Sequence, residues 1–303
     1  MSDPPKGPAN TAARPTAPPT QDLATLLVSC PDRRGIVAAL AQVLAGHGAN
    51  ILDSDQHTDR EAEQFFQRIR FDLSELTTDR LTLERALAEV AQRFAMKSRL
   101  LHSEQQKRVA LFVSKHDHCL IDLLLRHRAG ELGCQMVLVV SNHEDAAPIA
   151  AQYGVEFHCL KKTRENKAAQ EQREITLLDE HGVDLIVLAR YMQVLTPEFV
   201  RHFPERIINI HHSFLPAFVG GKPYHQARQR GVKLVGATAH YATADLDEGP
   251  IIEQDVVRCS HRDSVEDLVR KGRDLEKVVL ARAVRWHLED RVLLYGNKTV
   301  VFE

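Results

Sequence analysis

The sequence predicts an α/β protein built from two domains. Residues 21–103 show the order strand, helix, strand, strand, helix, strand, whereas the chain after residue 107 alternates strands with helices. A polar segment at 103–107 separates the two patterns. With 303 residues, of which 44% are hydrophobic, the chain is long enough for two ordinary globular domains.

The N-terminal pattern favours an antiparallel sheet with two helices on one face, the ferredoxin-like βαββαβ plan. Its first helix is predicted because Ile36, Leu40 and Leu44 recur at the spacing of one buried face, and Gly46 and Gly48 end it. The expected elements are a strand at 23–29, a helix from 36 to about 44, a strand opening at Asn50, a strand at 65–71, a helix over 83–94 and a short strand at 99–101.

The second pattern favours a Rossmann-like, mostly parallel sheet with helices on both faces, because strand–helix alternation gives right-handed crossovers. Two consecutive strands near its end, joined by a polar loop, break the alternation and predict a final antiparallel pair. The expected strands are 109–113, 135–140, 155–158, 184–188, 207–210, 232–241 and 250–256, and the expected helices are 120–126, 145–153, 164–181, 197–202 and 264–290.

Composition excludes several classes of partner. Lys and Arg together number 39 against 41 Asp and Glu, so the net charge of −2 argues against a surface for nucleic acid or anionic lipid. No run of about 18 apolar residues is present, so no membrane span is expected. The proline-rich residues 1–20 predict a disordered tail without a signal peptide. Five cysteines, an odd number without a C-x-x-C pair, favour reduced thiols and a cytoplasmic protein.

The stretch 209–216 (N-I-H-H-S-F-L-P) carries the candidate catalytic groups. It follows an apolar strand and ends at a proline, so its polar side chains lie where a strand gives way to a loop, which is where open α/β sheets bind ligands. Asn209 and His211 are two residues apart and therefore face the same side of the strand. An amide beside an imidazole suits the oxyanion of an acyl transfer, although a histidine satisfied by its neighbours remains an alternative here.

Other chemistries fit less well. No glycine occurs between residues 107 and 128, so the turn that wraps a phosphate in nucleotide-binding domains is missing. Cys119 beside His118 suggests a thiol nucleophile, but no third group is seen to orient the imidazole, and a packed thiol is favoured. The spacing of four histidines matches no zinc pattern, so metal-free chemistry is expected; they are His211, His212, His225 and His240.

A third candidate lies in the loop 242–249 between the last two strands. Asp247 stands in the sequence D-L-D-E-G-P, where the glycine and proline hold a turn. A solvated turn explains that pattern equally well when it is taken alone.

Three separated motifs, in order and at the expected distances, resemble the formyltransferases that use 10-formyltetrahydrofolate. They are Asn209-x-His211 with 213–216, the run 236–241 (G-A-T-A-H-Y), and 245–252 (D-L-D-E-G-P-I-I). The resemblance covers roughly residues 107–296. The N-terminal run P-D-R-R-G-I-V and the strand opening at Asn50 resemble an ACT domain. Together, residues 21–103 and 107–303 resemble the formyltetrahydrofolate deformylase family.

The resemblance implies roles for individual residues. It makes Asn209, His211 and Asp247 the catalytic trio, with 10-formyltetrahydrofolate as the substrate and no metal or other cofactor. The implied folate pocket consists of Arg190, Tyr191, Met192, Val194, Leu195, Thr243, Asp245, Glu248 and Gly249. The implied amino-acid effector site consists of Asp32, Arg34, Gly35, Ile36 and Asn50, although the ACT-like domain serves equally well as a ligand-free platform for a homo-oligomer.

The implied reaction is hydrolysis to formate and tetrahydrofolate, which would supply formate for purine synthesis and balance the one-carbon pool. A phosphoribosylglycinamide formyltransferase is the first alternative, but the missing glycine turn after the first strand departs from its phosphate site. A methionyl-tRNA formyltransferase would need an additional basic domain. The alternative from another class is a binding protein that responds to folate or an amino acid with little turnover.

Overall fold

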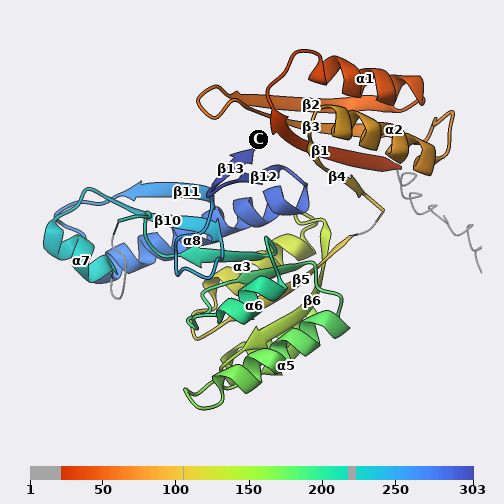
Figure 1. Cartoon of the computed structure of the whole chain (residues 1–303). Coiled ribbons are helices and arrows are strands. Elements are labelled where there is room, and N and C mark those ends of the chain that lie inside the picture. The colour runs from red at the N-terminus through yellow and green to blue at the C-terminus, as the bar shows by residue number, and fades with distance from the viewer. Residues whose placement is uncertain (1–21, 105, 218–222) are drawn as a thin grey trace, which may run out of the picture.

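The computed structural model describes residues 22–104, 106–217 and 223–303. It shows two α/β domains, an N-terminal one in red and orange and a C-terminal one in yellow to blue (Figure 1). The tail expected at 1–20 lies outside the described residues.

The N-terminal domain has the predicted ferredoxin-like order. Its four strands form an antiparallel sheet in the order β2-β3-β1-β4. Ile36, Leu40 and Leu44 are buried on one face of the first helix, as the spacing required. The elements are β1 (Leu23–Pro31), α1 (Ile36–Gly46), β2 (Asn50–Asp59), β3 (Gln64–Asp72), α2 (Arg80–Arg93) and β4 (Lys97–His102).

The C-terminal domain is organised around a seven-stranded sheet in the order β11-β10-β9-β8-β5-β6-β7. Strands β5 to β9 are parallel, and β10 is antiparallel to both of its neighbours. Its elements are β5 (Lys107–Val113), α3 (His118–Arg128), β6 (Cys134–Ser141), η1 (Glu144–Ala146), α4 (Ala147–Tyr153), β7 (Glu156–Cys159), α5 (Lys167–Glu180), β8 (Leu185–Leu188), α6 (Pro197–His202), β9 (Ile207–His211), α7 (Pro223–Arg230), β10 (Leu234–Tyr241), β11 (Ile251–Arg258) and α8 (Val265–Leu288).

Strict alternation along strand β5 divides the core of this domain in two. Val109 and Leu111 of β5 face the cluster that includes α3 and α8, whereas Ala110 and Phe112 face the cluster that includes α5 and α6. Successive side chains of a strand point to opposite faces, and a sheet covered on both faces needs both sets to be apolar. This explains why β5 lacks polar residues at 109–113.

A C-terminal hairpin that the sequence did not predict joins the two domains. It consists of β12 (Val292–Tyr295) and β13 (Lys298–Val301), and in Figure 1 it lies at the junction between the domains. Leu27 and Phe66, on the sheet of the N-terminal domain, form one buried cluster with Leu293 and Phe302. The helix α7 was also missed, because its sequence P-Y-H-Q-A-R-Q-R has little apolar periodicity.

None of the described helices has the length and apolar character needed to cross a membrane. The 24-residue helix α8 carries charged residues along most of its length and packs against β9, β10 and β11.

Candidate active site

Asn209 and His211 project from the same face of β9, near its carboxyl end. The strand is paired on one side with the parallel strand β8 and on the other with the antiparallel strand β10. Ile208 and Ile210, which alternate with them, are buried in the core on the opposite face. The apolar alternation therefore fixes the direction in which the amide and the imidazole point.

Asp247 reaches these residues from the loop between β10 and β11. Its backbone is left-handed, with φ of 58°. Two residues on, a Cβ at Gly249 would lie 1.8 Å from the carbonyl oxygen of Tyr241, so only glycine fits there. A hydrogen bond of 2.9 Å from the Tyr241 amide to the Pro250 carbonyl joins the two ends of the loop at this point. The D-L-D-E-G-P turn thus carries the carboxylate back toward the end of β9.

The carboxylate of Asp247 lies between two imidazoles. Its Oδ2 is 3.2 Å from Nδ1 of His211, and its Oδ1 is 3.7 Å from Nε2 of His240. Burial would raise the pKa of Asp247, but the interactions of the carboxylate with His211 and His240 outweigh burial and hold the pKa below its ordinary value. Asp247 is therefore a carboxylate at neutral pH.

His240 is the functional residue that the sequence did not single out as catalytic. It lies directly opposite Asn209 across β9 and β10, and Nδ2 of Asn209 is 3.1 Å from its Nε2. The Nδ1 of His240 donates to the carbonyl of Tyr241, so a neutral ring leaves Nε2 to accept from the amide. Only the pairing register of β9 and β10 reveals this contact.

His211 leaves one ring nitrogen available for chemistry. Because Nδ1 faces the carboxylate of Asp247, it carries the proton in the neutral ring. Nε2 is buried and has no hydrogen-bond partner among the described residues. A buried imidazole nitrogen is costly to leave unpaired, so this atom is suited to accept from a water molecule in the neutral ring and to donate to a substrate oxygen in the protonated ring.

A cavity of about 380 Å³ opens beside the trio. Its volume is in the range of small-molecule sites. Met192, Val194 and Leu246 are each more than half exposed and line the cavity, so apolar surface is available for a flat ring. Of the predicted folate residues, the cavity is lined by Arg190, Tyr191, Met192, Val194, Leu195, Thr243 and Asp245.

Two predicted folate residues do not line this cavity. Gly249 is pressed against the backbone of Tyr241, and the carbonyl of Glu248 accepts a hydrogen bond from Asn297. Their part is to shape the loop that carries Asp247. The resemblance also implied the whole segment 189–195 and the loop before Gly249 as pocket lining, and Gln193 and Leu246 do line the cavity. His212 lines it too and was not predicted for the pocket.

The loop at 190–192 is held from the core side. The hydroxyl of Tyr191 donates to Glu174, whose other oxygen lies 2.8 Å from the buried ammonium group of Lys162. Ser114 accepts a hydrogen bond from the amide of Met192, and its own amide donates to the carbonyl of Arg190. Ser114 stands at the end of β5, where the glycine turn is missing, and it ties that end to the cavity wall.

Comparison with known proteins places this geometry in a family. The family model for formyl transferase matches residues 107–284, and that for the ACT domain matches residues 24–95. A formyltetrahydrofolate deformylase from a Synechocystis species is 57% identical over 92% of this chain and 98% of its own length. The chain belongs to the formyltetrahydrofolate deformylase family.

Solved structures agree with this family membership. A deformylase of the family from Pseudomonas syringae is 47% identical and superposes with a TM-score of 0.91, over 94% of this chain and 96% of that one. A glycinamide ribonucleotide transformylase from Symbiobacterium toebii is 32% identical, with a TM-score of 0.62, over 65% of this chain and 95% of that one. The similarity to the transformylase therefore leaves about a third of this chain uncovered.

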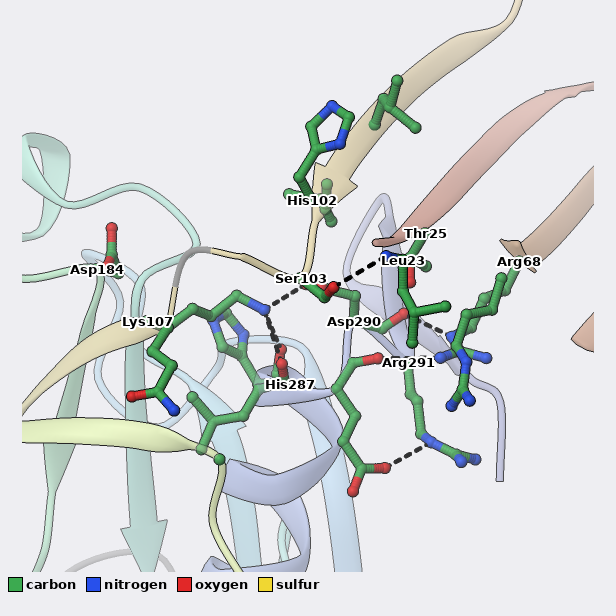
Figure 2. Close-up of a pocket in the computed structure, with 17 residues that line it drawn as sticks. Leu23, Thr25, Arg68, His102, Ser103, Lys107, Asp184, His287, Asp290 and Arg291 are labelled. Atoms are coloured by element: carbon green, nitrogen blue, oxygen red, sulfur yellow. Dashed lines mark hydrogen bonds and ion pairs between the residues drawn. The ribbon is translucent and has the colours of Figure 1, made fainter. Parts of the chain in front are cut away.

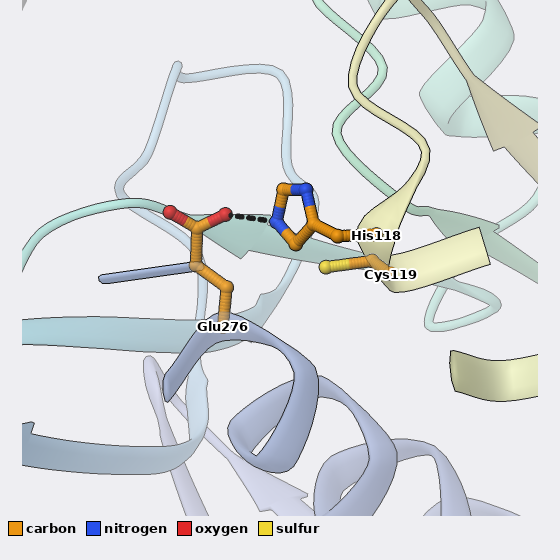
Figure 3. A group of neighbouring side chains, drawn as sticks. All are labelled: His118, Cys119 and Glu276. Carbon is orange, nitrogen blue, oxygen red and sulfur yellow. Dashed lines mark hydrogen bonds and ion pairs between the residues drawn. The ribbon is translucent and has the colours of Figure 1, made fainter. Parts of the chain in front are cut away.

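One cluster beside the site corrects the interpretation of His118. The sequence showed no group that orients its imidazole, but Nε2 lies 2.7 Å from Glu276 of α8 (Figure 3). The same carboxylate accepts from the hydroxyl of Tyr224 at 3.0 Å and lies 3.4 Å from Nε of Arg190. Glu276 is thus a buried hub that was missed, although it is a charged residue on the buried face of α8.

The same cluster resembles a metal site only in its spacing. His118, Cys119 and Glu276 place their ligand atoms within 4.8 Å of one another. However, Glu276 is already hydrogen-bonded to His118 and Tyr224 and paired with Arg190, and burial raises the pKa of Cys119 well above its usual value, so the sulfur is a thiol. Cys119 is fully buried, which agrees with the packed thiol that the sequence favoured.

The five predicted effector residues are not gathered in one site of the single chain. Strands β1 and β2 both pair antiparallel with β3 and run in the same direction. Asn50 begins β2, whereas Asp32 follows the last residue of β1, so the two are separated by roughly 25 Å, the length of the strand. Ile36 is buried in the domain core. Gly35, with φ of 91°, precedes α1 and has a conformational role.

Proposed function

We propose that this protein hydrolyses 10-formyltetrahydrofolate to formate and tetrahydrofolate. The observation that carries the proposal is the pair formed by His211 and Asp247 at 3.2 Å, with the free Nε2 of His211 and the amide of Asn209 beside the cavity. Membership of the deformylase family supports the choice of substrate.

The cavity is proposed to hold the pterin ring of the folate. Apolar side chains at Met192, Val194 and Leu246 offer faces for a flat ring, and the backbone of the 190–195 loop offers hydrogen-bonding groups at the edge. This position directs the formyl group toward the end of β9, where the catalytic side chains lie.

The catalytic steps follow from the protonation of the trio. The formyl oxygen accepts hydrogen bonds from the second amide hydrogen of Asn209 and from Nε2 of a protonated His211, which stabilise the oxyanion as water attacks the carbon. Asp247 orients the water and takes its proton, and His211 gives the proton of Nε2 to the folate nitrogen as the carbon–nitrogen bond breaks. The proton on Asp247 then returns His211 to its starting state, and formate leaves.

Water is proposed as the acceptor because the glycine turn that would hold a phosphate-bearing second substrate is missing. The first turn of α3 follows β5 without a glycine, and His118 in that turn is hydrogen-bonded to Glu276, which also accepts from Tyr224. A transferase resembling phosphoribosylglycinamide formyltransferase remains the second candidate because such enzymes share the C-terminal fold. A binding protein with little turnover is disfavoured by the assembled trio.

The proposed chemistry uses no metal or other cofactor, since the oxyanion and the transferred proton are both served by side chains. The proposed role is to supply formate for purine synthesis and to balance the one-carbon pool in the cytoplasm. All five cysteines are free, as that compartment favours.

We also propose that the ACT domain joins copies of the chain. Strand β2 is at the edge of its sheet, and Ile51 and Leu52 on it are 37% and 43% exposed. An unpaired edge with exposed apolar residues is a surface on which a second copy can pair. Light scattering at several protein concentrations tests this, and a monomer at all of them would contradict it.

The decisive experiment measures formate released from 10-formyltetrahydrofolate by the purified protein. We expect release without glycinamide ribonucleotide and no loss after treatment with a chelator. Turnover only in the presence of the nucleotide would establish a transferase. Absence of turnover, with the folate still bound, would establish a binding protein, and loss with the chelator would contradict the metal-free mechanism.

A further inference from the structure

A second cavity, of about 540 Å³, lies between the two domains (Figure 2). Its walls come from β1, β3 and β4 of the N-terminal domain and from the end of α8. Lys107, which begins β5, and Asp184, which directly precedes β8, also line it. These residues lie at the amino ends of the parallel strands. His211 lies at the carboxyl end of β9, so the cavity and His211 are at opposite ends of the strands.

Part of the positive charge in this cavity is engaged by the protein itself. The ammonium group of Lys107 binds the carboxylate of Asp290 at 2.5 Å and the carbonyl of Leu288 at 2.8 Å. The guanidinium group of Arg68 donates to the carbonyls of Glu289 and Asp290. Both cations therefore stabilise the carbonyl end of α8, where the helix dipole is negative.

Arg70 is not engaged in this way. It lines the cavity, its Nε is buried without a hydrogen-bond partner, and no ion pair to it is found among the described residues. Nδ1 of His102, in the same wall, is also buried and unpartnered, while its Nε2 lies 3.4 Å from Glu84. Unpartnered buried nitrogens are costly, and an acceptor placed in the cavity would remove that cost.

Ion pairs account for three of the four cationic side chains that line the cavity. Arg68 pairs with Asp53, Lys107 with Asp290 and Arg291 with Glu289, whereas no ion pair of Arg70 is found among the described residues. Burial, and then the nearby charge of Arg291, lower the pKa of Arg68, although Asp53 opposes the shift. Like charges are thus held close together in a partly enclosed space, where an anion is attracted strongly.

We propose that this cavity binds a small metabolite through its carboxylate or phosphate group, with Arg70 as the principal donor. Oxyanions are the usual partners of guanidinium groups, and the cavity is larger than one phosphate requires. The site is distinct from the proposed folate cavity and from the five residues first assigned to an amino-acid effector.

Binding at this site should not compete with folate binding, because the two cavities are at opposite ends of the strands of the sheet. The helix α8 connects them within the fold. Its last turn is held by Lys107 and Arg68, and its middle carries Glu276, which lies beside Arg190 of the folate cavity.

Calorimetric titration of the full chain with inorganic phosphate and, separately, with succinate tests the proposal. Sodium chloride at equal ionic strength is the reference. We expect one site per chain for at least one of the two anions, and the stronger of them shows whether a tetrahedral phosphate or a dicarboxylate is preferred. Arg70→Gln should weaken binding about tenfold or more, the loss expected for a charged hydrogen bond.

Two further variants test the proposal without relying on the correct folding of the Arg70 variant. Gln106→Glu adds a carboxylate to the exposed rim of the cavity and should also weaken binding. Arg85→Gln removes the same charge from an exposed position of α2 and should bind as the unaltered protein does. Equal binding by the Arg70 variant, no binding of either anion, or an anion that raises the KM for the folate would each overturn the proposal.

Discussion

Asn209 and His240 face each other across β9 and β10, with the amide nitrogen 3.1 Å from Nε2 of the imidazole. Because Nδ1 of His240 is bound to the carbonyl of Tyr241, the ring cannot turn without breaking a buried hydrogen bond. His240 therefore fixes the direction of the amide that we propose to stabilise the oxyanion. It acts as a positioning residue, and its contribution passes through Asn209.

The first prediction concerns the coupling of these two residues. His240→Ala and Asn209→Ala should each lower kcat by about tenfold to a thousandfold, the range for loss of one preorganised donor. The double variant should be little worse than Asn209→Ala, because both changes remove the same interaction. Steady-state formate release measures all three.

A matched control for this cycle is His261→Ala. His261 is exposed and lies in the segment that follows β11. It should leave kcat unchanged. Strictly multiplicative effects of the two active-site substitutions would show that His240 acts separately from Asn209.

The second prediction concerns Asp247. Asp247→Asn should lower kcat by about a hundredfold or more while the folate still binds, since the charge beside His211 is lost. Asparagine tolerates the left-handed backbone at this position, so the loop should keep its shape. Isothermal titration with a non-hydrolysable folate separates binding from turnover.

The pH dependence gives an independent check on Asp247. Its lowered pKa means that the carboxylate remains charged down to pH values below the ordinary value near 4. The stability that it contributes is present above that ordinary value and is lost only as the pH falls through the lowered pKa. A loss of activity between pH 8 and pH 5 that disappeared in Asp247→Asn would contradict this assignment.

The third prediction concerns the turn that carries Asp247. Gly249→Ala should destabilise the fold by about 1–3 kcal/mol, because the new methyl group would overlap the carbonyl of Tyr241. Urea unfolding measures the change. Gly46→Ala is the control, since nothing lies within 4 Å of a Cβ there and the last turn of α1 favours alanine by up to about 1 kcal/mol. Similar destabilisation by both variants would count against the close approach.

The fourth prediction concerns acid sensitivity. Burial, and then the charges of Lys107 and Arg99, lower the pKa of His287 to about 3. In the unfolded chain its pKa is about 6.5, so the unfolded state binds the extra proton first and stability falls as the pH drops below that value. Between pH 7 and pH 5 this residue should cost about 2 kcal/mol.

His287→Gln should remove that part of the pH dependence. In the unaltered protein the hydroxyl of Tyr241 is hydrogen-bonded to Nδ1 of His287. The side-chain amide of a glutamine at this position can still accept that hydrogen bond. Urea unfolding of both proteins at pH 7 and pH 5 gives the difference. An equal fall in stability in the variant would show that other groups control acid unfolding.

Much of the fold follows from local patterns. The spacing of Ile36, Leu40 and Leu44 gives a helix, and the apolar alternation of 207–211 gives a strand whose polar residues share a face. These features depend on neighbours within one element, so a single sequence contains them. The same is true of the D-L-D-E-G-P turn, although its glycine and glutamate shape the loop and do not line the cavity.

The residues that the sequence missed all depend on contacts between distant elements. His240 meets Asn209 through the register of two strands, and Glu276 meets His118 across 158 positions of the chain. The hairpin β12–β13 is stabilised by Leu27 and Phe66 of the other domain, which no local pattern records.

By itself, the sequence determined the two-domain α/β architecture and the order of most of its elements, because periodicity and strand ends are local properties. The three residues of the proposed trio came from the resemblance of its motifs to a known family. The tertiary structure alone decided which groups surround that trio, that Asp32 and Asn50 lie at opposite ends of their sheet, and that cationic side chains of both domains share one cavity. Those outcomes depend on strand register and domain docking, which are set by the packing of apolar faces far apart in the chain.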